Sequence, residues 1–275
     1  MATKKTLWRT LAATAAVLLA TTLAACSGTS VSGDTITAGK LTIGTGNPAY
    51  EPWVVGDAPE SGEGFEAAVA YAVAEKLGFK SADVIWVRTT FDEAIAPGSK
   101  NFDFNLQQYS ITDERKANVD FSSAYYETAQ VVVTVATSPA ASATSIADLK
   151  GYLLGAATGT TSYDAIGSVI KPTQKAQAFN SNDDAKAALT NGQVDAIVLD
   201  LPTALYASCC ELDGGKIVGQ LPTAAKGDQF GLVLDKGSKL TAAVTKALDE
   251  LRADGTLAKL EEKWLTADAG VPVLK

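Results

Sequence analysis

The sequence predicts an α/β protein in which helices cover a mostly parallel sheet. Short apolar runs bounded by turn residues, typical of buried strands, alternate with segments whose apolar residues recur every three or four positions, typical of amphipathic helices. This alternation occurs twice, before and after about residue 130, and no fixed-period repeat accompanies it. The length of 275 residues allows either one large domain or two lobes.

The first 25 residues have the layout of an export signal. Three basic residues occur in the first nine positions, and an uncharged run follows from residue 11 to residue 25, shorter than the ~20 residues of a membrane span. The run ends in Leu23-Ala24-Ala25-Cys26, which resembles a bacterial lipobox. The resemblance implies cleavage before Cys26 and a lipidated thiol that anchors the mature protein to a membrane surface outside the cytoplasm. The alternative is a secreted protein that begins with a free cysteine.

The charge balance of the chain is acidic. The formal net charge is −8, and removal of residues 1–25 takes away three positive charges and no negative one, which leaves −11. Nucleic-acid binding requires clusters of Lys and Arg, so the composition argues against it. An acidic body suits a soluble carrier that an anionic surface repels.

Histidine is absent from the sequence, which excludes several classes of site. Ser-His-Asp and Cys-His nucleophilic systems and His-ligated zinc cannot be built without it. Apart from Cys26, the sequence contains only Cys209 and Cys210, which are adjacent and can form a vicinal disulfide. We interpret this pair as a local structural feature near a loop, and we expect neither a metal nor a cofactor.

Residue spacing predicts the elements of the first half. Residues 26–40 are rich in Ser, Thr, Gly and Asp and indicate a flexible tether, after which residues 41–44 form a strand. The apolar residues of segment 65–77 recur at four-residue spacing, as on one helix face, and Gly78 ends this helix. Further elements expected here are strands at 84–87 and 102–106 and a helix that begins at 91–95.

The second half repeats the alternation. Strands are expected at 131–135, 152–156 and 194–199, and helices at 162–170, 183–190, 240–251 and 257–264. Ligands of open parallel sheets bind outside the carboxyl ends of the strands. The candidate site therefore consists of the loops after the strands, at 44–53, 107–115, 157–161 and 200–203.

Ser110 and Arg115 lie at the start of a predicted helix in one of these loops. Ser110 can cap the helix, and the exposed amides of a helix start attract an anion. Arg115, one turn into the helix, could then bind a carboxylate through two hydrogen bonds. A surface ion pair between Arg115 and an acid of the same helix explains the motif equally well.

The second set of elements offers a similar loop and a buried acid. Gly159 lets the backbone approach a ligand and Thr160 or Thr161 offers a hydroxyl, although an ordinary helix cap explains them as well. Asp200 ends a buried apolar run, where a carboxylate is costly without a partner. A ligand ammonium would satisfy Asp200, and so would capping of the helix after Pro202.

Tyr50, Trp53 and Phe91 lie at or near strand ends, where aromatic rings can enclose the apolar part of a ligand. Most aromatic residues belong to the core. The proximity of these three to Arg115 and Asp200 in the predicted topology favours a binding role.

The joint order of these segments resembles the family-3 solute-binding proteins, which bind amino acids for ABC importers. The resemblance extends from about Leu41 to Leu265. It is carried by Tyr50-Glu51-Pro52-Trp53, Gly64-Phe65-Glu66, Ser110-Ile111-Thr112 with Arg115, Val119-Asp120-Phe121-Ser122 through Tyr125-Tyr126, Gly159-Thr160-Thr161, Gly192-Gln193-Val194-Asp195-Ala196, and Ala253-Asp254-Gly255-Thr256 with Lys263-Trp264. Each motif is loose, but their common order is specific.

The resemblance implies a two-lobed periplasmic-binding-protein type II fold whose lobes close on a ligand. Lobe 1 would contain residues 41–126 and 226–270, and lobe 2 residues 131–221. Crossing segments would lie near 127–130 and 222–225. It also implies a monomer that delivers an amino acid to the subunits of an ABC permease.

The family's binding residues transfer to this sequence by position. The resemblance implies that Arg115 binds the ligand α-carboxylate with help from Ser110 and Thr161. Asp200 would bind the α-ammonium. Tyr50 and Phe91 would flank the ligand side chain, together with Trp53, and Thr160 would complete the second loop.

Other positions depart from the family pattern and bear on the choice of ligand. Gln107 and Gln108 stand where the family often has small residues, so they would shape the pocket. Asn47 stands where cation-selective members carry an acid, which argues against lysine or arginine and favours an uncharged polar amino acid such as glutamine. Arg88 could accept an acidic side chain or be a surface arginine.

Two other functions are compatible with such a fold. A few relatives are dehydratases of aromatic precursors, but histidine is absent and Asp200 is the only evident acid of the predicted cleft. A sensory domain is usually fused to a membrane helix and a signalling module, and neither precedes Lys275 after the leader. The sequence therefore favours a carrier that is not an enzyme.

Overall fold

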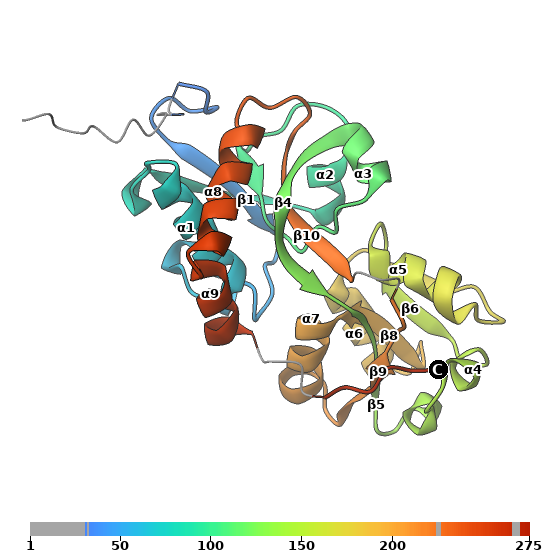
Figure 1. Cartoon of the computed structure of the whole chain (residues 1–275). Helices are drawn as coiled ribbons and strands as arrows, with labels where there is room; N and C mark the ends of the chain where they lie inside the picture. Colours follow the sequence, from blue (N-terminus) through green and yellow to red (C-terminus); the bar gives the residue numbers. More distant parts are fainter. Residues whose placement is uncertain (1–30, 32, 224–226, 266–269) are drawn as a thin grey trace, which may run out of the picture.

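The computed structural model describes residues 31, 33–223, 227–265 and 270–275, and it shows two α/β lobes that face each other (Figure 1). Each lobe contains a five-stranded sheet with helices packed against it. The α/β, two-lobed class predicted from the sequence is confirmed.

The first sheet belongs to lobe 1. Its strands, in spatial order, are β2 (Val84–Thr89), β1 (Leu41–Gly46), β3 (Phe104–Asn105), β10 (Asp228–Asp235) and β4 (Val119–Thr128). β1 is parallel to β2 and β3, whereas β10 is antiparallel to β3 and β4. Four strands therefore run in one direction, and β10 alone in this sheet is reversed.

The second sheet, of lobe 2, repeats this plan. Its strands, in spatial order, are β7 (Gln177–Phe179), β6 (Leu154–Ala157), β8 (Ala196–Asp200), β5 (Gln130–Val135) and β9 (Gly215–Gln220). β6 is parallel to β7 and β8, and β5 is antiparallel to β8 and β9. Each lobe is thus mostly parallel, as expected, with one strand reversed.

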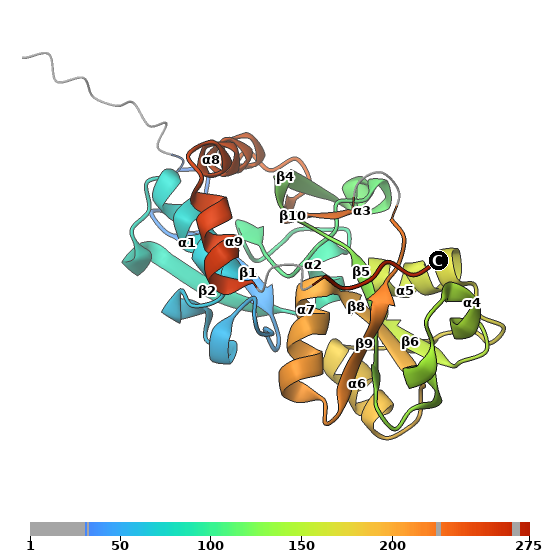
Figure 2. The same ribbon diagram turned by 60° about the horizontal axis from the view of Figure 1, so that its bottom comes forward.

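The helices of lobe 1 pack around an aromatic core. They are α1 (Phe65–Lys76), α2 (Phe91–Ile95), α3 (Asp113–Asn118), α8 (Thr241–Ala253) and α9 (Thr256–Trp264). Figure 2 shows α1, α8 and α9 side by side, and these helices contact one another. The predicted stripe of α1 is buried at Phe65, Val69 and Val73, against residues of β1 and α8 such as Ile43 and Leu248.

The helices of lobe 2 include two that continue as π-helical turns. They are α4 (Ile146–Leu149), α5 (Thr161–Ala165) with the π turn Ile166–Ile170, α6 (Asn182–Thr190), and α7 (Leu201–Tyr206) with the π turn Ala207–Glu211. Cys209 and Cys210 form a disulfide in the second π turn. A local structural feature near a loop was expected, and the disulfide lies in the last turn of a helix, just before the loop that precedes β9.

The chain passes between the lobes at three places. β4 ends at Thr128 and β5 begins at Gln130, so the first crossing is nearly continuous strand (Figure 1). The second crossing joins β9 to β10. After α9 the chain returns to lobe 2. There the backbone N–H of Gln220 in β9 donates to the Pro272 carbonyl at 2.8 Å, and the backbone carbonyl of Gln220 accepts from the Leu274 amide at 2.9 Å. This third passage was not predicted from the sequence.

The segment before β1 differs from the predicted tether. Val31 is buried in the core of lobe 1, and the Asp103 carboxylate accepts from the amides of Ile36 at 2.9 Å and Thr42 at 2.7 Å. Buried Asp103 needs donors, and these amides supply them. Residues 33–40 are therefore attached to the lobe. Residues 1–30, with the predicted leader and Cys26, lie outside the described part of the chain.

Within the described part of the chain, none of the helices combines the length and apolarity that crossing a membrane requires.

Candidate functional site

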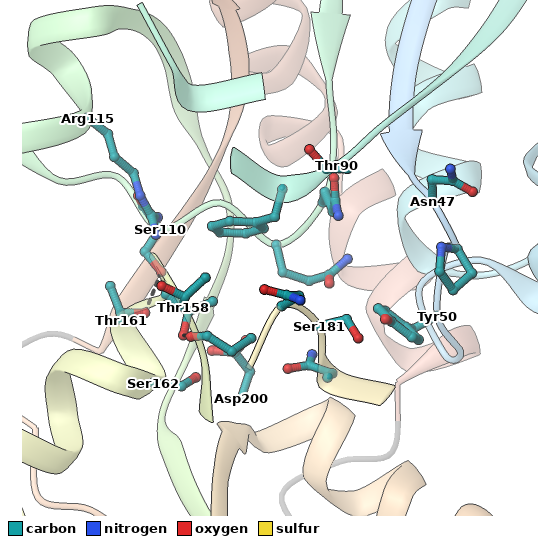
Figure 3. Close-up of a pocket in the computed structure, with 18 residues that line it drawn as sticks. Asn47, Tyr50, Thr90, Ser110, Arg115, Thr158, Thr161, Ser162, Ser181 and Asp200 are labelled. Carbon is teal, nitrogen blue, oxygen red and sulfur yellow. Dashed lines mark hydrogen bonds between the residues drawn. The ribbon is translucent and has the colours of Figure 1, made fainter. Parts of the chain in front are cut away.

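A cavity lies between the lobes, where the carboxyl ends of the parallel strands of both sheets meet. The loops after β1, β2 and β3 form its wall in lobe 1, and those after β6, β7 and β8 form its wall in lobe 2 (Figure 3). The lining residues are Asn47, Pro48, Tyr50, Thr90, Phe91, Gln107, Gln108, Ser110, Arg115, Ala157, Thr158, Thr160, Thr161, Ser162, Asn180, Ser181, Asn182 and Asp200. The structure brings together every predicted binding residue except Trp53.

Arg115 enters the cavity from α3 of lobe 1. Its side chain is buried, and its guanidinium donates to the carbonyl of Ser110 at 2.7 Å and to that of Gly159, across the lobe interface, at 2.8 Å. These bonds fix the planar group and leave further N–H donors for an anion. The alternative of a surface ion pair is excluded, because Arg115 is only 7% exposed.

Phe91 covers the guanidinium of Arg115. The ring centroid lies 5.2 Å from the central carbon of Arg115, and Phe91 also packs on Tyr109 at 4.7 Å between ring centroids. A cation over a ring face is attracted by the ring's negative centre. Phe91 therefore orients Arg115 as well as forming an apolar wall.

The loop after β6 approaches Arg115 closely because of Gly159. This residue has φ of +69°, and a Cβ atom there would lie 2.7 Å from the Asp92 carboxylate of lobe 1. Glycine is thus required both by the backbone and by the contact. Thr160 caps α5 by accepting from the Tyr163 amide at 3.2 Å, which is the ordinary helix-cap role considered above.

Ser110 and Thr161 join the lobes at the same end of the cavity. Their hydroxyl oxygens lie 3.0 Å apart, drawn as a dashed line in Figure 3. The expectation that Ser110 caps α3 is wrong. Thr112 does so, accepting from the Arg115 amide at 3.2 Å, because it directly precedes the helix.

Asp200 enters the cavity from the end of β8 in lobe 2. It stands at the N-cap of α7, but its side chain makes no capping hydrogen bond. Its carboxylate instead accepts from the side-chain amide nitrogen of Gln130 at 2.8 Å. Burial and then nearby Asp228 raise the pKa of Asp200 to about 7, against the lowering effect of the Gln130 hydrogen bond. A cation in the cavity would therefore be favourable.

Gln108 is hydrogen-bonded to the buried carboxylate of Glu66. Its backbone has φ of +52°, and its amide donates to the Glu66 carboxylate at 2.8 Å. The side-chain amide of Gln108 and the hydroxyl of Tyr125 donate to Glu66 as well. Burial raises the pKa of Glu66 to about 7, and these three donors oppose the shift. The side-chain oxygen of neighbouring Gln107 accepts from the Tyr109 hydroxyl at 2.8 Å.

The residues that line the opposite end of the cavity are uncharged and mostly polar. Figure 3 shows Asn47 and Tyr50 far from Arg115, with Ser181 of lobe 2 facing Tyr50. Burial and then Asp183 raise the pKa of Tyr50 to about 12, so its hydroxyl stays neutral, and Ser181 is its side-chain hydrogen-bond partner. Lys186 lies 5.3 Å from the Tyr50 ring centroid.

Several residues that line the cavity were not predicted from the sequence. Thr90 and the segment 180–182 were not expected in the site. β7, which precedes that segment, has three residues and an exposed, polar start, so no strand signal placed its loop among the candidates. The Ser181 cap signal of α6 was the available clue, because helix starts after parallel strands face the ligand side.

Trp53 does not line the cavity, contrary to its predicted role. It is fully buried in the lobe 1 core, packed edge-on against Phe65 and Phe230. Its indole N–H donates to the hydroxyl of Thr203, on α7 of lobe 2, at 2.9 Å. Trp53 therefore contributes to lobe closure rather than to ligand contact.

We expect Thr203→Val to weaken ligand binding by about 5- to 100-fold without changing the order of ligand preference. Valine leaves the buried indole N–H of Trp53 without an acceptor in the closed form, which costs about 1–3 kcal/mol. Calorimetric affinities for several amino acids test this, with exposed Thr190→Val on α6 as the matched control. A changed order of preference would show instead that this pair contacts ligand.

Arg88 lies on the outer side of the site. It donates to the Gly46 carbonyl at 2.8 Å and pairs with Asp57, and it is not among the residues that line the cavity. The structure therefore favours a surface arginine that supports the loop after β1 over a receptor for an acidic ligand side chain.

The described residues contain no group of three or more His, Cys, Asp and Glu side chains arranged to hold a metal ion. The polar groups of the cavity instead suit an organic ligand. Arg115 offers a cation to one end of a ligand, Asp200 offers an anion, and neutral amides and hydroxyls surround the rest.

Comparisons with known proteins identify the kind of protein that carries such a site. Residues 41–267 match the family described as bacterial extracellular solute-binding proteins, family 3. The L-arginine-binding protein of Pseudomonas aeruginosa is 31% identical over 232 residues, which are 80% of this chain and 86% of that protein. The L-cystine-binding protein TcyJ of Escherichia coli is 30% identical over 207 residues, which are 74% of this chain and 75% of that protein.

Solved structures of amino-acid-binding proteins are also similar to this chain. An ancestral arginine-binding protein bound to arginine has a TM-score of 0.70 and 36% identity, and the match covers 83% of this chain and 99% of that one. An ancestral arginine-binding protein bound to glutamine has the same TM-score and identity. The ancestral amino acid-binding protein AncCDT-1, a precursor of cyclohexadienyl dehydratase, has a TM-score of 0.68 and 31% identity, covering 83% of this chain and 96% of that one.

Proposed function

Because this chain belongs to the family 3 bacterial extracellular solute-binding proteins, we propose that it is the receptor of an amino-acid importer and binds a polar, uncharged amino acid between its lobes. The observation that carries the proposal is the placement of Arg115 in lobe 1 and Asp200 in lobe 2, on one enclosed cavity. An amino acid has a carboxylate and an ammonium on the same carbon. Such a ligand satisfies both residues at once and links the lobes.

The far end of the cavity supports an uncharged polar side chain. Asp200 is the only acidic residue among the described residues that line the cavity, and the α-ammonium would occupy it. No carboxylate then remains for a guanidinium or a lysine ammonium. Asn47, Thr90 and Ser181 offer neutral donors and acceptors, which suit an amide such as that of glutamine.

Ligand binding would act through closure of the lobes. A ligand shifts an equilibrium between open and closed forms only by its differential affinity for the two. A shift from 1:99 to 99:1 requires ~5.5 kcal/mol, which a bidentate Arg115 contact and an Asp200–ammonium contact in a closed cleft can supply. The direct Ser110–Thr161 and Trp53–Thr203 contacts would form on closure.

The membrane anchor and the downstream partner follow from the same proposal. A lipidated Cys26 would hold the receptor at the membrane, and the closed form would dock on an ABC permease. A dehydratase on the same fold is the alternative. The names of the curated relatives, which are binding proteins, support a carrier.

A thermal-shift screen of the twenty amino acids, followed by calorimetry, tests the ligand class. We expect glutamine or another uncharged polar amino acid to give the largest increase in melting temperature, and a prephenate-type substrate to remain unchanged after incubation. The proposal fails if no amino acid stabilises the protein, and product formation would establish the enzyme instead.

We expect Asn47→Asp to raise the affinity for arginine relative to glutamine about tenfold or more. The new carboxylate would face the side-chain end of the cavity, where a guanidinium gains a charge-assisted hydrogen bond. Calorimetry with both ligands measures the ratio, and Asn191→Asp at the exposed end of α6 is the matched control. An unchanged ratio would place Asn47 away from the ligand side chain.

A further inference from the structure

Gln130 joins carboxylates of the two lobes at the first crossing. Its side-chain nitrogen donates to Asp200 of lobe 2 at 2.8 Å and to Asp228 of lobe 1 at 2.7 Å. Its side-chain oxygen accepts from the Ser162 hydroxyl at 2.6 Å. Gln130 is 5% exposed, so these contacts lie away from bulk water. One neutral amide thus holds two acids close together.

Backbone pairing at the hinge keeps the two acids together. Asp228 of β10 pairs with Thr128, and Asp200 of β8 pairs with Gln130, so only Ala129 separates the two pairing positions along the crossing strand. The Ala129 carbonyl also accepts from the amide of Leu201 at 3.0 Å. A rotation of the lobes about this crossing moves atoms beside it least. We therefore expect the two acids to stay neighbours when the lobes open.

Two neighbouring carboxylates in a buried site do not ionise independently, since like charges disfavour each other. Several charged or titratable groups face Asp200. Asp228 on β10 and Glu66 on α1 raise the pKa of Asp200, and Arg115 on α3 lowers it. Tyr125 on β4 interacts with Asp200 and stays neutral, because burial raises its own pKa. Because two acids and one arginine surround Asp200, an additional positive charge beside Asp200 is favourable.

We propose that Asp228 supports the ammonium subsite as a second carboxylate behind Asp200, and that Asp200 exchanges a proton for the ammonium of the incoming ligand. This inference rests on the proposed function as an amino-acid receptor. Ligand-free Asp200 holds this proton beside Asp228, and binding releases the proton to the solvent as the ammonium takes its place. Asp228 acts through Asp200 and Gln130, because it does not itself line the cavity. A ligand without an amino group cannot make the exchange.

The sign of the pH dependence follows from this exchange. Below about pH 7 Asp200 is protonated, so the ammonium must displace a proton and affinity falls by up to about tenfold for each pH unit. Above pH 7 Asp200 is already ionised, and affinity no longer depends on this step. Asp228→Asn removes the second charge, so the decline in affinity moves to lower pH.

Carbon-13 NMR of ligand-free protein, labelled at the aspartate carboxyl carbons, tests the pair without any ligand. We expect one aspartate to titrate near pH 7, to vanish in Asp200→Asn and to titrate at lower pH in Asp228→Asn. Asp235→Asn, at the other end of β10, is the control and should leave this signal unchanged. Glu66 does not interfere, since glutamate is unlabelled. The proposal is overturned if no aspartate of the wild type titrates above about pH 5.5.

Calorimetry with L-glutamine in buffers of different ionisation enthalpy then measures proton release. We expect up to one proton released per glutamine bound near pH 6, and markedly less in Asp228→Asn. Binding of glutamine without proton release and with constant affinity from pH 5.5 to 7.5 would overturn the exchange while leaving the amino-acid receptor intact. Absence of binding by any amino acid would instead remove the proposed function, and the NMR titration would still decide whether the carboxylate pair holds a proton.

Discussion

Arg115→Ala should lower the affinity for the amino-acid ligand by about 30-fold to several thousand-fold, while the protein still folds. The guanidinium is buried, is fixed by the carbonyls of Ser110 and Gly159, and faces the cavity. Removal of one partner of a buried, hydrogen-bonded charge pair costs about 2–5 kcal/mol, because the other charge remains desolvated and unpaired. Calorimetry measures the loss, and circular dichroism checks the fold.

Two further variants separate charge from geometry at this position. Arg115→Lys retains the charge but not the planar fork of donors, so we expect it to recover only part of the affinity. Arg252→Ala removes an arginine of α8 that pairs with Asp249 outside the cavity, and its affinity should equal that of the wild type. Near-normal binding by Arg115→Ala would refute the assignment of Arg115 to the ligand carboxylate.

Asp200→Asn should reduce the affinity by a similar factor and should also abolish the pH dependence near neutrality. The substitution keeps the shape of the side chain and removes the charge that would pair with the ligand ammonium, which costs about 2–5 kcal/mol. Since the pKa of Asp200 is about 7, wild-type affinity should decline as the pH falls below 7. Asparagine has no proton to gain, so the affinity of the variant should be flat over this range.

Asp213→Asn, at an exposed position of lobe 2, controls for the loss of one negative charge from an acidic protein. Its affinity and pH profile should match those of the wild type. If Asp200→Asn binds as tightly as this control at pH 8, the ammonium subsite must lie elsewhere.

The local elements that the sequence predicted well have strong periodic signals. The stripe of α1 and the apolar run of β8 are buried as expected, because their spacing states which face lies inside. β4 and β10 were missed. Their pairing shifts register at Gly231, so burial in β4 follows no strict two-residue period. The helix considered after Pro202 is α7, and it begins one residue earlier, at Leu201, because proline is favourable in the first turn of a helix.

The candidate site was easier to predict than its surroundings. Arg115 and Asp200 are charged residues at strand or helix ends, where burial would be costly without a function, and such positions stand out in a sequence. Trp53 shows the opposite case, since a core aromatic and a ligand-stacking aromatic have the same sequence signal. The roles of Gln130 and Asp228 depend on strand register across the crossing, which no local pattern contains.

A crystal structure of the protein with its bound amino acid tests the central claim most directly. We expect the ligand carboxylate within hydrogen-bonding distance of the Arg115 guanidinium, and its ammonium within hydrogen-bonding distance of the Asp200 carboxylate, with the two lobes closed around it. A ligand that contacts only one lobe, or that lies outside the cavity shared by Arg115 and Asp200, would contradict the account.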